Sequence, residues 1–353
     1  MSVELYVMTS LQKKLDKLVK DGYVRVQRHP QLPLSIYTYT QKAEIERNWT
    51  PETRMARGLV LDDSGRVVIN CVPKFFNIGQ PGAEKVAFED CYITAKEDGY
   101  MIQIINDHEY GLIVTSKGSF ESKYAQTARN LVLNSLHNNK LPEDILFCCE
   151  LLMDFPGDEA IIVTKHGNVP KLKCWAVRFN DGSELFPTSV KLPSFLTPVE
   201  SFTPTRARKY LERSGIEGVV LYDIDTQARV KVKTQEFIER HRFISNITPK
   251  NIWERLKNGE TLVDMNIPDE FLPQVKSIYQ SIMADYREVK RNSFRLVGMT
   301  RNMTNKAIAL NTSLGLSEED KHLIFFFRRN PSGDEVFDFY WNKVKPDNSK
   351  EKT

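Results

Sequence analysis

The stretch ITAKEDGYMIQI, residues 93 to 104, places one lysine, Lys96, and two acids between two runs of strand-forming residues. Its alternating apolar residues predict strands that meet at a polar turn. Most lysines in such turns are solvated. A KxDG string alone is weak evidence, because roughly one chain in ten of this length contains one by chance. Taken by itself, the stretch leaves two interpretations open for Lys96, a solvated turn residue or a nucleophile held at the end of a strand.

Strand patterns continue on both sides of this stretch, from about residue 22 to 235. Residues 57–70, RGLVLDDSGRVVIN, predict a hairpin, and residues 91–120 predict three strands separated by polar turns. A helix is expected at about 122–137. Further strands are expected at 145–153, 160–165, 171–179, 218–224 and 229–234. Four prolines within 187–205 predict a loop, and a helix follows near 204–214.

Helical patterns dominate beyond residue 245. Thr248 and Pro249 predict the start of a helix that ends at Gly259, and apolar residues recur at helical spacing from Pro268 to Val289. Ser317 with Asp320 predicts another helix start, and a last helix is expected near 334–344. The sequence therefore predicts an α+β protein, with an antiparallel-sheet domain at 1–243 and an all-α domain at 244–353.

Composition limits the classes of function. The 353 residues are 41% hydrophobic and 27% charged, with no apolar run of about 18 residues that could span a bilayer. The N-terminus lacks the order of a secretory signal, so we expect a cytoplasmic protein without membrane contact. The five cysteines have no CxxC spacing and are expected to be reduced core thiols. The net charge of +3 lies in residues 241–353, a small excess that permits contact with nucleic acid without arguing for it.

A lysine nucleophile needs particular neighbours. A free lysine has a pKa of about 10.4 and must lose roughly three pKa units to be half neutral near pH 7.5, which other cations, a bound metal or burial can supply. The chain offers such cations and carboxylates near predicted strand ends: Arg57, Lys74, Lys117, Glu150, Glu217, Lys231 and Lys233. Lys231 and Lys233 are two residues apart on one predicted strand, so both side chains point to the same face. Two ammonium groups on that face repel each other unless an anion lies between them.

The order of these residues resembles the motifs of the covalent nucleotidyltransferases. An Arg-Gly hairpin, KFFN, KEDG, SKGS, a glutamate after an apolar strand, IEGVV and KVK follow one another over residues 35 to 240. Within that superfamily the chain looks like the RNA ligase 1 family of T-even-type bacteriophages. The motifs are short individually and specific jointly.

The resemblance implies an ATP-dependent RNA ligase of the antiparallel-sheet, ATP-grasp-like type. In that family a lysyl-AMP forms first, an adenylylated RNA follows, and a 3′-hydroxyl end is then sealed to a 5′-phosphate end. The implied cofactors are ATP as substrate and Mg²⁺, with Mn²⁺ able to substitute. The implied partner is RNA, including broken tRNA in tRNA repair. A monomer in the cytoplasm of a bacterial host, encoded by a bacteriophage, is the expected setting.

The resemblance also assigns roles to individual residues. Lys96 matches the nucleophile of the KxDG motif, and Asp98 and Gly99 complete that motif. The remaining matches are Arg57 and Lys74 for nucleotide phosphate or the RNA end, Glu150 for ribose or metal-bound water, Glu217 for the metal or the lysine, Lys231 and Lys233 for the α-phosphate and pyrophosphate, and Lys117 for sealing. Gly99 is expected to let the backbone turn sharply.

Some assignments leave alternatives open. Tyr37 matches a family tyrosine near the nucleotide, and a core aromatic residue explains it nearly as well. Asp264 is a candidate metal ligand or a solvated helix-end acid. The family's Pro-x-x-Arg after the third-motif glutamate is missing, because FPGDEAIIV has Asp158 and Glu159 where a basic residue is expected.

Three competing functions remain. DNA ligases and messenger-RNA capping enzymes share the lysine chemistry but carry an OB-fold of about five short strands after the KxK motif, which the helical pattern beyond 245 does not predict. A catalytically inactive RNA-binding homologue would form no protein–AMP adduct.

Overall fold

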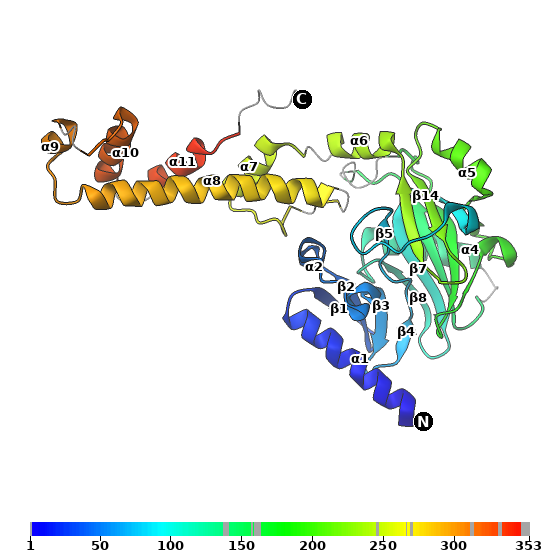
Figure 1. Cartoon of the computed structure of the whole chain (residues 1–353). Helices are drawn as coiled ribbons and strands as arrows, with labels where there is room; N and C mark the ends of the chain where they lie inside the picture. The colour runs from blue at the N-terminus through cyan, green and yellow to red at the C-terminus, as the bar shows by residue number, and fades with distance from the viewer. Residues whose placement is uncertain are drawn as a thin grey trace. The chain divides into compact units, whose positions relative to one another are not determined.

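The computed structural model describes residues 2–136, 141–156, 158, 164–244, 247–265, 267–268, 271–310, 314–330 and 334–346. The chain forms two compact units, Met1–Ser245 and Asn246–Thr353 (Figure 1). The predicted division at residues 243 and 244 differs from this one by two residues.

The first unit contains three sheets. The four-stranded sheet has the order β1 (Val24–Arg28), β2 (Leu34–Tyr39), β3 (Arg57–Asp62) and β4 (Val67–Ile69). The six-stranded sheet has the order β11 (Glu184–Leu185), β10 (Lys171–Phe179), β9 (Ile145–Leu152), β7 (Tyr100–Asp107) and β8 (Gly111–Ser116), with β12 (Leu196–Pro198) parallel to β10. The five-stranded sheet has the order β13 (Ser201–Phe202), β6 (Tyr92–Lys96), β14 (Gly218–Tyr222), β15 (Arg229–Lys233) and β5 (Phe76–Asn77). Most pairs are antiparallel, which confirms the predicted sheet type.

The segment that contains Lys96 crosses between two of these sheets. Residues 91–120 form three strands as predicted, yet β6 belongs to the five-stranded sheet, whereas β7 and β8 belong to the six-stranded sheet. Residues 97–99 are the link between them. Lys96 is therefore the last residue of β6, at the point where the chain leaves the five-stranded sheet and enters the six-stranded sheet.

Helices of the first unit cap or cover the sheets. They are α1 (Ser2–Lys20), α2 (Gln41–Glu46), α3 (Pro51–Met55), α4 (Lys123–Leu136), α5 (Pro204–Leu211) and α6 (Gln235–Ile244), with 3-10 turns at Phe88–Asp90 and Pro187–Ser189. The side chains of Thr50 and Thr203 cap α3 and α5, each followed by a first-turn proline. The prediction of a plain loop at 187–205 is wrong in part, because β12 and β13 lie there. Pro198 is tolerated at the end of β12, an outer strand, where a missing N–H costs little. The predicted strand at 160–165 falls largely outside the described residues.

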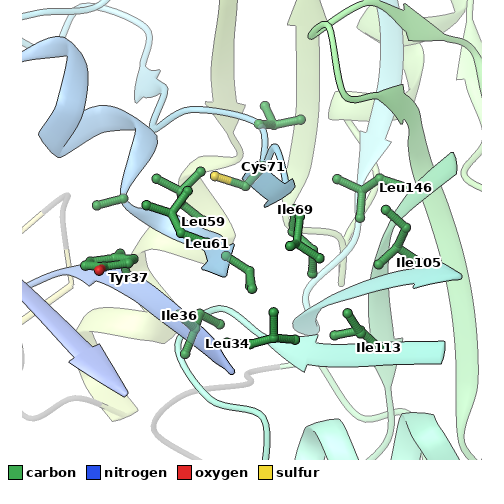
Figure 2. Packing of buried hydrophobic residues seen from close by; sticks show 14 of the residues in the cluster. Leu34, Ile36, Tyr37, Leu59, Leu61, Ile69, Cys71, Ile105, Ile113 and Leu146 are labelled. Carbon is green, nitrogen blue, oxygen red and sulfur yellow. The ribbon is translucent and has the colours of Figure 1, made fainter. Parts of the chain in front are cut away.

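The hydrophobic core of the first unit joins the sheets. Leu34 and Leu59 of the four-stranded sheet pack with Ile105, Ile113 and Leu146 of the six-stranded sheet (Figure 2). A second cluster lies under the five-stranded sheet and includes Ile93, Val219, Val230 and Ala207 of α5. Because side chains alternate along a strand, this packing turns Tyr92, Thr94 and Lys96 to the opposite face.

The second unit is entirely helical where it is described. It contains α7 (Pro249–Lys257), α8 (Leu272–Met299), α9 (Asn305–Leu310), α10 (Glu318–Arg329) and α11 (Asp334–Lys343). Thr248 caps α7, and Ser317 forms the predicted capping box with Asp320. Leu296 of α8 packs with α9, α10 and α11 in one core. The described residues of this unit form no strand, which confirms the all-α prediction and disfavours the OB-fold of DNA ligases and capping enzymes.

Every described helix is too short or too polar to cross a lipid bilayer.

Candidate active site

Strand register builds one wall of the site. Three rungs cross the five-stranded sheet from β6 through β14 to β15: Tyr92, Tyr222 and Arg229; Thr94, Val220 and Lys231; Lys96, Gly218 and Lys233. Residues of one rung lie on the same face of the sheet. The register therefore places Lys231 and Lys233 on one face, as their alternation predicted, together with Lys96, which lies more than 100 residues earlier in the chain.

Glu217 joins two of these lysines. One carboxylate oxygen lies 2.6 Å from the Lys96 Nζ, and the other lies 3.2 Å from the Lys233 Nζ. Burial alone would raise the pKa of Glu217, but Lys96 and Lys233 together hold that pKa below its ordinary value. Glu217 is thus a buried, ionised carboxylate that fixes the direction of the Lys96 ammonium group.

Two glycines near this cluster lie where a neighbouring strand leaves no room for a side chain. A Cβ on Gly218 would lie 1.9 Å from the Val232 carbonyl oxygen, so only glycine fits beside Glu217. A Cβ on Gly99 would lie 2.8 Å from the Leu151 carbonyl oxygen of β9. Gly99 is not among the glycines with positive φ. The chain bends at Gly99 as expected, but without a positive φ, and the position also requires glycine because β9 passes too close for a side chain.

Glu150, Trp175 and Arg57 form the facing wall. Glu150 lies on β9, and its Oε2 is a buried acceptor with no hydrogen-bond partner in the described structure. The Nε1 of Trp175 on β10 is likewise a buried donor without a partner there. Burial raises the pKa of Glu150 to about 7, although Lys96 and Arg57 act against that rise. Buried polar groups are almost always paired in proteins, so these two atoms mark a wall built to meet a polar ligand.

The pocket between the walls encloses about 730 Å³ including its open mouth. The end of the pocket far from Lys96 is lined by aromatic rings and by a salt bridge. Tyr92 and Phe186 stack with ring centroids 3.8 Å apart. Glu184 accepts from Arg229 at 2.8 Å and also from Arg178. The pocket thus runs from a cationic end at Lys96 and Lys231 to an aromatic end, a gradient that suits a molecule with phosphates at one end and a planar ring at the other.

Lys74 and Lys117 form a second cluster outside the residues that line the pocket. Lys74 is only 3% exposed, pairs with Glu44 at 2.9 Å and lies 5.1 Å from the ring centre of Tyr39. The Lys117 Nζ lies 4.0 Å from the centre of the same ring. The two lysines therefore flank Tyr39 outside the pocket lining. A contact of Lys74 with nucleotide phosphate or the RNA end stays a prediction.

Tyr37 is not among the residues that line the pocket, and Asp264 belongs to the other unit of the chain. Tyr37 is a buried member of the core shown in Figure 2, which favours the core-aromatic alternative. Asp264 belongs to the second unit, where its exposed carboxylate accepts from the backbone N–H and hydroxyl of Thr261. Asp264 is thus a solvated acid, as the alternative expected, but it lies in a turn between α7 and α8, not at a helix end.

Glu150 is the carboxylate in this pocket that has an unpartnered oxygen available for a divalent metal. Both oxygens of Glu217 already face lysines, whereas the Oε2 of Glu150 is unpartnered. Among the described residues, three potential ligands converge only at Asp107, His108 and Asp144, outside the pocket. There, Arg66 already pairs with Asp107. For Glu217, which is expected to act on the metal through water or on the lysine, both carboxylate oxygens contact lysines.

Asp158, the acid found where a basic residue was expected, has a structural partner set. It accepts hydrogen bonds from the Tyr100 hydroxyl at 2.9 Å, the Tyr124 hydroxyl at 2.8 Å and the Lys123 ammonium at 2.9 Å. Despite partial burial, these donors lower the pKa of Asp158. Asp158 thereby ties the first residue of β7, directly after the KEDG segment, to the start of α4.

Sequence reasoning missed much of the aromatic end. Arg229 and Tyr222 share a rung two residues from Lys231 and Val220, so the strand register could have identified them. Trp175, near which the family resemblance places the adenine, was not missed, and it occupies a bulge where β10 shifts register against β9. Glu184 and Phe186 come from a short strand and its turn, which carry no motif.

A family model of RNA ligases matches residues 55–180, a little over a third of the chain. This match confirms the resemblance to RNA ligases for that segment. The segment contains five of the predicted site residues: Arg57, Lys74, Lys96, Lys117 and Glu150. It ends before Glu217 and the lysines of β15, whose place beside Lys96 follows from the strand register.

Solved structures similar to this chain include a putative ATP-dependent DNA ligase from Aquifex aeolicus, with 17% identity, a TM-score of 0.46, and coverage of 90% of this chain and 80% of that one. An archaeal ATP-dependent RNA ligase has 12% identity, a TM-score of 0.47, and coverage of 97% and 81%. A Naegleria gruberi RNA ligase variant with ATP and Mn has 14% identity, a TM-score of 0.30, and coverage of 43% and 52%. With TM-scores below 0.5, none of these carries an argument about activity. No curated protein matches the chain by sequence.

Proposed function

We propose that this chain is an ATP-dependent RNA ligase that joins 3′-hydroxyl and 5′-phosphate RNA ends through a lysyl-AMP. The observation that carries the proposal is the cluster of Lys96, Glu217 and Lys233, from which Lys96 lines the cationic end of a pocket whose other end is aromatic. The RNA ligase family match over residues 55–180 supports RNA as the substrate.

The proposed first step uses Lys96 as nucleophile. The neutral Nζ attacks the α-phosphorus of ATP, a P–N bond forms, and the P–O bond to the β-phosphate breaks to release pyrophosphate. Lys96 must first lose a proton, and the Glu217 oxygen at 2.6 Å is the nearest base. Lys231 on the adjacent rung is positioned on the same face to stabilise negative charge that develops on the phosphates.

The later steps transfer and release AMP. An oxygen of the RNA 5′-phosphate attacks the AMP phosphorus, which breaks the P–N bond and returns Lys96 as an amine. The RNA 3′-hydroxyl then attacks the activated 5′-phosphate, closes the phosphodiester and releases AMP. A magnesium ion, which Mn²⁺ can replace, would neutralise phosphate charge in these steps, and Glu150 is the carboxylate best placed to hold it or the ribose.

The nucleotide orientation follows from the two ends of the pocket. The triphosphate belongs beside Lys96 and Lys231, and the base belongs against Trp175 and the stacked pair of Tyr92 and Phe186. Arg57 lies beside Trp175, with its guanidinium carbon 5.8 Å from the ring centre, and borders the phosphate end. We further propose that the helical unit selects the RNA and that broken tRNA is the natural substrate.

Incubation with α-labelled ATP and Mg²⁺, followed by a denaturing gel, tests the first step. The full chain and a Lys85→Ala variant, which alters an exposed lysine outside the pocket, are expected to carry label. Lys96→Arg retains a cation for Glu217 and is expected to fold and carry none. Label on Lys96→Arg, or label from GTP in place of ATP, would refute the assignment. Faster sealing of tRNA broken in its anticodon loop than of linear RNA of equal length would support the repair role.

A further inference from the structure

The outer face of α8 is strongly basic. Between residues 286 and 306 the chain has six Lys or Arg residues and one acid, Glu288. Four of the six lie on α8 at intervals of three or four residues: Arg287, Lys290, Arg291 and Arg295. Such spacing places them on one side of the helix, and all four are exposed.

These cations lack the counterions that basic residues have elsewhere in the same unit. Lys257 pairs with Asp338, and Lys343 pairs with Glu319. By contrast, Arg287, Lys290 and Arg291 form no ion pair within the described part of the chain. Arg295 donates to the Asn292 side-chain oxygen and contacts the Met299 sulfur, neither of which carries a charge. The face therefore carries a local positive charge that is not neutralised within the described unit.

A large aromatic ring stands among these cations. Phe294 is 65% exposed and lies one position before Arg295. The apolar residues that α8 needs for folding lie on its other side, where Val275, Ile282 and Leu296 are buried and where α7, α10 and α11 pack (Figure 1). Phe294 is thus not part of the core of this unit.

We propose that this outer face of α8, defined by Arg287, Lys290, Arg291, Phe294 and Arg295, docks a single-stranded stretch of RNA. The proposal rests on the proposed function for the nature of the polymer. Positive side chains interleaved with an aromatic ring fit a phosphate backbone whose unpaired bases can stack. From Arg287 to Arg295 the helix rises about 12 Å, which spans roughly three or four nucleotides at about 3.4 Å each.

Two other polyanions can be weighed against RNA. An anionic membrane surface would favour a continuous apolar stripe along the helix, whereas this face offers one ring within a row of cations. An acidic protein segment would use the charges without needing Phe294. The stacking ring therefore favours a nucleic acid, and its substitution distinguishes these partners.

Fluorescence anisotropy of a labelled, unstructured RNA 12-mer, titrated with the full-length chain, tests the surface. The variant R287A/R291A/R295A is expected to bind at least tenfold more weakly in about 0.1 M salt, with the slope of log K against log salt reduced by about 2, because each phosphate contact on a single strand contributes about 0.7. Phe294→Ala is expected to weaken binding at least fivefold. The matched control R206A/R208A/K343A removes three charges that are each ion-paired, to Glu200, Glu89 and Glu319, and is expected to change binding less than twofold.

Adenylylation by labelled ATP separates this proposal from the proposed function. Unchanged AMP labelling with weakened RNA binding in the two α8 variants supports the surface. Unchanged RNA binding in both variants overturns it, whether or not the chain labels with AMP. A triple-arginine variant that loses binding to phosphatidylserine vesicles or to a polyglutamate peptide, while Phe294→Ala binds RNA as tightly as the unmodified chain, also overturns it in favour of a simple charge contact.

Discussion

Replacement of Glu150 by glutamine tests whether this carboxylate lacks a compensating partner, because the substitution is expected to raise stability and to lower activity. The substitution keeps the shape of the side chain and removes its charge. Glu150 is half-buried, its Oε2 is a buried atom with no partner among the described residues, and the pKa of the carboxyl is raised to about 7. A carboxylate in this situation makes the folded state less stable whenever it is ionised.

The magnitude follows from the pKa difference. Below pH 4.5 the carboxyl is protonated in both the folded and unfolded chain, so Glu150→Gln is expected to change the free energy of unfolding little. Between pH 4.5 and 7 the unfolded chain releases the proton first, which increasingly favours unfolding. Above pH 7 the penalty is complete at about 3 kcal/mol, since about 2.5 pKa units each correspond to about 1.4 kcal/mol.

Urea unfolding at pH 5 and pH 8, monitored by tryptophan fluorescence, measures this difference. Glu150→Gln is expected to be more stable than the unmodified chain by up to about 3 kcal/mol at pH 8 and by well under half of that at pH 5. AMP labelling of the same variant is expected to fall at least about tenfold, because the carboxylate that meets the ribose or metal is lost.

Glu184→Gln is the matched control. It makes the same chemical change in the same pocket, but Glu184 is ion-paired with Arg178 and Arg229, and its pKa is lowered because these arginines outweigh its burial. It is expected to lose about 3 kcal/mol at pH 8, because two buried guanidinium groups lose their counterion. If Glu150→Gln were destabilising at pH 8, or equally stabilising at both pH values, the inference that Glu150 is an uncompensated carboxylate would be wrong.

Three further substitutions test the framework. Gly218→Ala is expected to cost at least about 3 kcal/mol or to prevent folding, because its Cβ would lie 1.9 Å from the Val232 oxygen; a normal urea midpoint would contradict this. Gly298→Ala in α8, where an added Cβ has open space, is expected to raise stability by about 0.5–1 kcal/mol, and a lowered midpoint would show that this glycine is needed. Asp158→Asn is expected to lower the free energy of unfolding by about 2 kcal/mol at pH 7. Because the pKa of Asp158 is lowered in the fold, this difference from the unmodified chain is expected to shrink below about pH 4. A constant difference down to pH 3 would show that Asp158 is not an ionised acceptor for the Tyr100 hydroxyl.

The cluster around Lys96 was predictable because strand alternation is a local property. Once Lys231 and Lys233 are assigned to one strand, both must share a face, and the strand ends bring Glu217 to the same edge. The amphipathic helices beyond residue 245 were predictable for the same reason, since α7 and α10 begin at the expected capping residues.

Other placements depend on contacts that no local pattern encodes. Lys74 follows a strand as the motif requires, yet Glu44 and Tyr39, about 30 residues earlier, enclose it. Tyr37 and Ile36 point to opposite faces of β2, and only the packing of the sheets decides that the Tyr37 ring is buried. Asp158 finds donors on β7 and α4, elements that meet only in the folded chain.

The three-rung register also limits how this protein can change over evolutionary time. Every position in β6 serves either the core, as Ile93 does, or the pocket, as Thr94 does. A one-residue insertion or deletion within Tyr92–Lys96 would exchange the two sets in a single event and place Lys96 among hydrophobic side chains. Length variation is instead expected in the exposed turn at 223–226, beyond the far end of β14 from Lys96, where added residues leave every rung in place.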